Sequence, residues 1–90
     1  MFRGSAITRA KRAGLLRNVC VALGNWGAPE AVPVLVRALA DAEVLVRGQA
    51  AWALGRVGTG EARESLLEMP RGETNHWVWQ EIADASSRAS

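Results

Sequence analysis

The 90-residue sequence is poor in the side chains that most often carry chemistry, with one cysteine, one histidine and no tyrosine. A single cysteine, Cys20, excludes an internal disulfide, and it cannot supply the several thiolates of an iron–sulfur cluster or a multi-cysteine zinc site. His76 has no second histidine to join it as a metal ligand. The sequence therefore predicts no catalytic residue, no metal ligand and no bound cofactor in this chain.

Long apolar runs are also missing. None approaches the roughly 18 apolar residues that a membrane-spanning helix needs. The arginines near the N-terminus are not followed by the apolar stretch of a secretory signal. We therefore expect a cytoplasmic chain with a reduced thiol and no membrane contact.

Acidic residues are absent from positions 1–29, which hold five basic residues, whereas positions 30–90 hold six basic and nine acidic residues. A basic end of this kind is typical of proteins that contact an anionic partner such as a nucleic acid. It is equally typical of a solvated chain terminus. The charge distribution alone leaves both interpretations open.

The sequence does contain an internal repeat. Residues 21–31 align with residues 52–62, and residues 41–46 align with residues 73–78. Self-similarity at a spacing of about 30 residues is typical of a helical solenoid, whose helix pairs cannot bury their apolar faces alone. This predicts an all-α fold, a short α-solenoid of helix pairs with about five helices.

Glycine and proline divide the chain into segments. We expect helix breaks near residues 27–29, 41–43, 58–60 and 70–73. The expected organisation is a basic linker or short helix at residues 1–13, helical repeats at 14–86, and a frayed tail at 87–90. Pro33 predicts a kink or a 3₁₀ start in the second helix.

The spacing of apolar residues predicts which helix faces are buried. In the first helix, which we expect to start near Leu15, the inward residues would be Leu15, Val19, Ala22, Leu23 and Trp26. In the middle helix, they would be Val46, Ala50, Ala53 and Val57. A second row of that helix, Gly48, Ala51 and Gly55, is small enough to let a neighbouring helix approach closely. In the last helix, Val78, Ile82 and Ala85 would face inward.

Residues 41–58 carry an acid, a Val-Arg pair, an Ala-Ala pair and an Ala-Leu-Gly phrase in succession. In this pattern the chain resembles the HEAT-like repeat family, including its phycobilisome-lyase-type members. The resemblance implies that Arg47 has a structural role and pairs with an acid before its helix, here Asp41 or Glu43.

A sharper resemblance concerns residues 2–27, where the matching positions are Phe2, Gly4, Ser5, Ile7, Arg9, Lys11, Arg12, Leu15, Arg17, Asn18 and residues 22–25. This stretch looks like the segment that joins the catalytic part of epoxyqueuosine reductase to its C-terminal HEAT-like repeats. Residues 46–55 are similar to the same family. The resemblance implies a parent enzyme that reduces epoxyqueuosine at the tRNA wobble position with cobalamin and two [4Fe–4S] clusters. Two such clusters need about eight thiolates, so this chain is expected to be a non-catalytic fragment.

The resemblance also implies contact with the tRNA anticodon stem-loop and with the catalytic domain of the parent protein. Basic side chains contact phosphates, and an aromatic ring beside an arginine can stack on an unpaired base. The predicted nucleic-acid-binding residues are Arg9, Lys11, Arg12, Arg17, Trp52 and Arg56. Trp26 and Trp77 are expected in the core, and Trp79, which stands where Arg47 stands one unit earlier, is either an end cap or a contact residue.

The alternative is a free-standing HEAT-like adaptor that binds another protein through its helical face. An enzyme in its own right ranks behind both. The open apolar ends of a short solenoid also allow self-association.

Overall fold

The computed structural model describes residues 5–89, which form five α-helices and two 3₁₀ turns and contain no strand. The elements are α1 (Ser5–Trp26), η1 (Pro29–Ala31), α2 (Val32–Leu39), α3 (Val44–Val57), α4 (Gly60–Glu68), η2 (Met69–Gly72) and α5 (His76–Ala89). The prediction of an all-α fold with five helices is confirmed. The expected 3₁₀ start of the second helix lies at Pro29–Ala31, and Pro33 follows in the first turn of α2, where its missing N–H costs no hydrogen bond.

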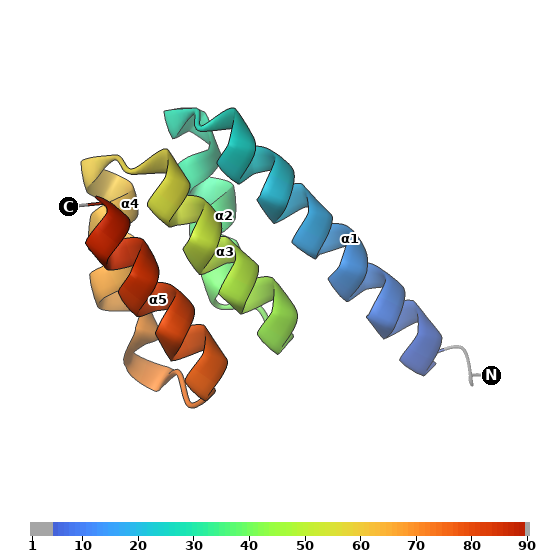
Figure 1. Ribbon diagram of the computed structural model, residues 1–90. Coiled ribbons are helices and arrows are strands. Elements are labelled where there is room, and N and C mark those ends of the chain that lie inside the picture. Colours follow the sequence, from blue (N-terminus) through green and yellow to red (C-terminus); the bar gives the residue numbers. More distant parts are fainter. Residues whose placement is uncertain (1–4, 90) are drawn as a thin grey trace.

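The helices form two layers (Figure 1). Helices α1, α3 and α5 lie side by side and run in the same direction, while α2 and α4 cover one side of them. Helix α3 is the centre of the molecule, since it packs against α1 on one side, α5 on the other, and both covering helices. Stacked helix pairs of this kind are the architecture of a helical solenoid.

Helix α1 begins at Ser5 rather than near Leu15. Residues 5–13, which we expected to form a linker or a short helix of their own, are therefore the first half of one continuous helix. Alanine, lysine and arginine dominate this half, and all three are strong helix formers. Its lack of an apolar stripe reflects its position, because it projects beyond the end of α3 (Figure 1). At the other end, residues 87–89 belong to α5, and residues 1–4 and 90 lie outside the described part.

Two glycines end the inner helices. Gly27 and Gly58 adopt φ values of 70° and 66°, in the left-handed region that favours glycine. The Gly27 N–H donates to the Leu23 carbonyl and the Gly58 N–H to the Leu54 carbonyl, each at 3.0 Å. The repeated Leu-Gly-x-x-Gly motif therefore ends both helices in the same way.

The core is built where small residues let helices approach closely. A Cβ atom added to Gly55 would lie 2.7 Å from the Ala85 Cβ of α5, and one added to Gly48 would overlap the Trp77 ring. The row of small residues predicted on the middle helix is thus confirmed. The stripe beside it is confirmed at three of its four predicted positions, where Val46, Ala50 and Ala53 are buried, and Val57 is partly buried.

The predicted inward residues of α5, Val78, Ile82 and Ala85, are all buried.

The predicted inward face of α1 is wrong. Its buried residues are Ala13, Cys20 and Gly24, whereas Leu15 and Trp26 are 65% and 63% exposed. Val19 and Ala22 are exposed as well, and only Leu23 of the predicted set packs against the core. The reason is again close approach. A Cβ atom on Gly24 would lie 2.8 Å from the Trp52 ring and 3.0 Å from the Ala53 Cβ, so only the small-residue side of α1 fits against α3.

Trp26 therefore lies on the free side of α1, and the prediction that it belongs to the core is wrong. Trp77 is partly exposed, but its ring covers Gly48 of α3. The two tryptophans expected in the core thus differ, because only Trp77 faces a neighbouring helix.

Gly55→Ala should lower the free energy of unfolding by about 1–3 kcal/mol, the usual cost of overpacking a tight core. The new methyl would meet the backbone of Ala85, which cannot rotate away. Gly14→Ala is the matched control, because a Cβ there has no atom within 4 Å. It should stabilise the protein by up to about 1 kcal/mol through helix propensity. Urea unfolding followed by circular dichroism measures both, and equal effects would contradict the close α3–α5 contact.

Candidate nucleic-acid interface

The six residues predicted to bind nucleic acid lie on α1 and α3 but do not form one cluster. Gly24 marks the place where α1 contacts Trp52 of α3. Arg9 precedes Gly24 by 15 residues, which corresponds to about 22 Å along a helix axis. The predicted set therefore divides into a group near the α1–α3 contact and a group on the projecting half of α1.

Trp52 and Arg56 form the centre of the first group. The guanidinium carbon of Arg56 lies 5.5 Å from the centroid of the Trp52 ring, a cation–π geometry one helical turn apart. Trp52 is partly buried against α1, whereas Arg56 is exposed. The arginine covers one face of the ring, so a base would reach the ring only at its remaining free surface or by displacing Arg56.

Arg17 belongs to the same group. It lies seven residues before Gly24 and thus on the same side of α1. Its Nε and Nη2 atoms donate to the Asn18 Oδ1 at 3.3 and 3.1 Å, which leaves its charge without a carboxylate partner among the described side chains. The contact between α1 and α3 is therefore lined by Arg17, Trp52 and Arg56.

Arg9 and Lys11 form the second group, on the half of α1 that extends beyond α3 (Figure 1). Both are exposed. Because successive helical residues are turned by about 100°, these two side chains point to nearly opposite sides of the helix. They suit contacts with phosphates on two sides of α1 better than a single binding pocket.

Arg12 is held by a carboxylate. Its Nη2 and Nη1 atoms donate to Asp41 Oδ1 and Oδ2 at 2.6 and 3.3 Å. These hydrogen bonds lower the pKa of Asp41 and, with the charge of that carboxylate, raise the pKa of Arg12. A phosphate would therefore compete with Asp41 for this arginine.

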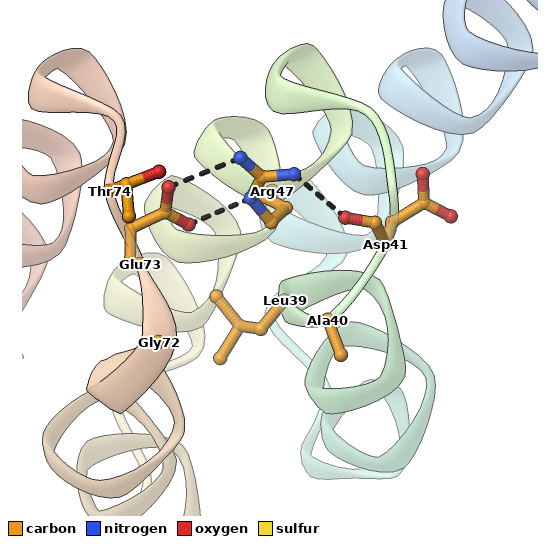
Figure 2. A pocket seen from close by; sticks show the side chains of 7 residues that line it. All are labelled: Leu39, Ala40, Asp41, Arg47, Gly72, Glu73 and Thr74. Carbon is orange, nitrogen blue, oxygen red and sulfur yellow. Dashed lines mark hydrogen bonds and ion pairs between the residues drawn. The ribbon is translucent and has the colours of Figure 1, made fainter.

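Arg47 is the hub of a second polar contact, in a groove between the loop after α2 and the loop before α5 (Figure 2). Its Nε and Nη2 atoms donate to Glu73 Oε1 and Oε2 at 2.7 and 3.1 Å. Its Nη1 atom donates to the carbonyl oxygens of Asp41 and Ala42 at 2.9 and 3.1 Å. The arginine thereby ties α3 to both loops.

The prediction that Arg47 pairs with the carboxylate of Asp41 or Glu43 is wrong, because its carboxylate partner is Glu73. The carboxylate of Asp41 already accepts hydrogen bonds from Arg12 and from the Glu43 N–H. Arg47 therefore reaches only the Asp41 backbone and takes its carboxylate from the next loop.

The two acidic loops are equivalent. Asp41 accepts the N–H of Glu43 at 2.9 Å, and Glu73 accepts the N–H of Asn75 at 2.9 Å. Each acid thus shapes its own loop and binds the arginine of the preceding inner helix, Arg12 or Arg47. We call this pair of contacts the arginine–acid ladder.

Trp79 occupies the position of Arg47 on α5. Its Nε1–H donates to the Glu73 carbonyl at 2.8 Å, just as Arg47 Nη1 donates to the Asp41 carbonyl, in both cases six residues back. The indole has a single N–H donor, so Trp79 makes the same backbone contact as Arg47 but cannot also donate to a carboxylate. This contact favours the end-cap interpretation of Trp79, and the sequence alone did not reveal it.

The remaining chemical candidates have other environments. Cys20 is buried, and burial raises the pKa of its thiol to about 11. His76 is exposed at the start of α5. Within residues 5–89, no three His, Cys, Asp or Glu side chains are grouped so as to hold a metal ion. No helix in this part of the chain is long and apolar enough to span a bilayer.

Comparison with known proteins agrees with this architecture. The family of HEAT repeats matches residues 4–87, and the chain therefore belongs to the HEAT repeat family. It is also 38% identical over 63 residues to epoxyqueuosine reductase of Bacillus cereus, a match that covers 66% of this chain and 17% of that protein. The resemblance to a repeat segment of that enzyme family is thus confirmed, and the chain spans less than a fifth of its relative's length.

Arg47→Ala should lower the free energy of unfolding by about 2–3 kcal/mol. The substitution leaves the Glu73 carboxylate, only 5% exposed, without its cation. It also removes the donor to two loop carbonyls. Arg12→Ala is the matched control and should cost clearly less, because that arginine side chain is 52% exposed. Equal losses in urea unfolding would contradict a central role for Arg47.

Stability should also depend on pH through the ladder. The hydrogen bonds of Arg47 lower the pKa of Glu73 below its ordinary 4.5, so the unfolded chain takes up a proton before the folded one. The contribution of Glu73 is therefore complete above its ordinary pKa and is lost as the pH falls through the lower folded value. Glu73→Gln should start less stable at pH 7 and lose less stability on acidification. Urea unfolding at pH 7, 5, 4 and 3 tests this, and parallel curves for both proteins would refute it.

Proposed function

We propose that this chain is a non-catalytic HEAT-like repeat module of an epoxyqueuosine-reductase-like protein, in which it contributes tRNA contact and packing against the catalytic domain. The observation that carries the proposal is the 38% identity to epoxyqueuosine reductase over 63 residues. The basic first third of the chain, which contains no acid, supports contact with an anionic partner.

The chemistry of such a protein would lie in its other parts. Two [4Fe–4S] clusters require about eight thiolates, and the one thiol here is buried and kept protonated by its surroundings. The residues of this chain instead suit binding. Cobalamin and the clusters would thus be held by other segments of the polypeptide.

For tRNA contact, we propose Arg17, Arg56 and Trp52 along the α1–α3 contact and Arg9 and Lys11 on the projecting half of α1. The ion pairs of the described side chains engage Arg12 and Arg47 but none of these residues. An anticodon stem-loop offers stem phosphates for the arginines and unpaired bases for an aromatic edge. Arg12 would contribute only after releasing Asp41.

The second candidate is a free-standing adaptor that binds another protein. The exposed large apolar side chains on the free side of α1, Leu15 and Trp26 above all, favour it. The two functions differ in the ligand that they require, and a test of tRNA binding separates them.

The test is binding of a fluorescein-labelled tRNA anticodon stem-loop, measured by anisotropy over a range of salt concentrations. If Arg9 and Arg17 contact phosphates, the variant Arg9→Ala/Arg17→Ala should bind more weakly at low salt. The slope of log affinity against log salt should flatten by about 1.4–1.8, since each lost contact contributes about 0.7–0.9.

The control is Arg63→Ala/Arg71→Ala, which removes the same charge from exposed arginines of α4 and η2. It should bind like the wild type apart from a small general effect. Equal weakening of both variants would show that only net charge matters. If the wild-type chain does not bind the stem-loop, the tRNA contact is refuted and the adaptor becomes the better interpretation.

A further inference from the structure

Helix α1 carries a seven-residue repeat on the side that faces away from α3. The positions follow alternating steps of four and three residues, and all are exposed: Thr8, Arg12, Leu15, Val19, Ala22 and Trp26. This alternation is the pattern by which one helix packs along another. We call these residues the α1 seam. The seam holds the exposed large apolar side chains of the helix, Leu15, Val19 and Trp26, and α3 contacts the opposite, small-residue side.

The apolar surface continues onto α2. A groove of about 230 Å³ separates the two helices, and its lining includes Val19, Cys20, Val34 and Ala38. Val34 is 41% exposed. In the inner layer, α3 has a helix on each side, whereas α1 has one on a single side (Figure 1). The α1 seam and this groove together form an exposed apolar surface on the side of α1 that has no neighbour in the inner layer.

The charges around the seam select the kind of helix. Lys11 lies at its N-terminal end and Arg37 lines the groove, whereas Arg12 is already paired with Asp41, which also lines the groove. Pairing with α1 of a second copy would bring together two helices that each hold four basic residues and no acid, and this is unfavourable.

The acidic surface of a second copy fits no better. Helix α4 exposes Glu61, Glu64 and Glu68, but Leu67 is the one large apolar side chain exposed on this helix. A single leucine cannot match the apolar repeat of the α1 seam. The occupant therefore needs both features at once, an apolar stripe and acidic flanks.

We propose that the α1 seam docks an amphipathic helix whose apolar stripe is flanked by glutamate or aspartate and which belongs to the remainder of a longer polypeptide. The inference deepens the domain-packing part of the proposed function and rests on it. The length of the Bacillus cereus relative supports it, because the matched region is 17% of that protein. Four-three packing of a single helix against α1 would bury Leu15, Val19 and Trp26 in the manner of a coiled-coil seam.

The probe is a fluorescein-labelled peptide of three heptads, with leucine at positions a and d and glutamate at e and g. A second peptide with lysine at e and g is its charge control. The full 90-residue chain should bind the glutamate peptide at least about ten-fold more tightly than the lysine peptide. The variant Leu15→Gln/Trp26→Gln should weaken binding of the glutamate peptide at least about ten-fold, a difference that anisotropy resolves easily. Both side chains are exposed, so circular dichroism should show an unchanged fold.

The matched control is Leu67→Gln on α4, whose side chain is 69% exposed and lies outside the seam. It should bind the peptide like the wild type. Equal binding of the two peptides, or equal binding by the wild type and the seam variant, overturns the proposal. Dimerisation of the wild type in sedimentation, abolished by the seam variant, also overturns it, because a second copy would then be the occupant.

The same variants separate this inference from tRNA contact. Leu15→Gln/Trp26→Gln removes no charge and should bind the anticodon stem-loop with unchanged affinity and salt slope. If stem-loop binding holds while the peptide does not bind, the seam is refuted and the tRNA part of the proposed function stands.

Discussion

The structure depends on how closely α3 approaches its two neighbours. Gly24 of α1 meets Ala53, and Gly55 of α3 meets Ala85, at distances that leave no space for an added Cβ atom. Close approach of backbones increases the number of van der Waals contacts along the whole helix pair. It also ties the register of the inner layer to these contacts, because each of the two glycines lies where the neighbouring helix approaches most closely. The two covering helices and the connecting loops are arranged around this fixed layer.

The arginine–acid ladder is a consequence of that register. With parallel inner helices, the loop before one helix lies beside the helix that precedes it, so Asp41 meets Arg12 and Glu73 meets Arg47. Nearly buried, bidentate pairs are worth more than exposed ones, but they stabilise only if both partners are held in place. Here the acids are held by N–H groups of their own loops. Trp79 ends the ladder by making the backbone contact alone.

Sequence reasoning succeeded where the signal is local. The glycine helix ends, the small row of α3 and the inward residues of α5 follow from spacing within one element. It failed for α1, because the pattern identifies an apolar stripe but not the side on which the neighbouring helix lies. In this helix the small residues, and not the large ones, make the contact. It also missed Glu73 as the partner of Arg47, since a pair 26 residues apart depends on the packing of two helices. For the same reason it could not show that Asp41 engages Arg12.

The same apolar stripe, on the free side of α1, makes the two proposed contacts of this helix compatible. Arg17 lies on the side of α1 that meets α3, where Trp52 and Arg56 extend the surface. Leu15 and Trp26 lie on the opposite side, because the seam is turned by roughly half a circle from Arg17. A stem-loop bound along the α1–α3 contact would therefore leave the seam free, and a helix docked on the seam would leave Arg17 and Arg56 free. If both proposals hold, the opposite faces of α1 would let the module bind an RNA and a second helix at once, with their separation fixed by the width of the helix.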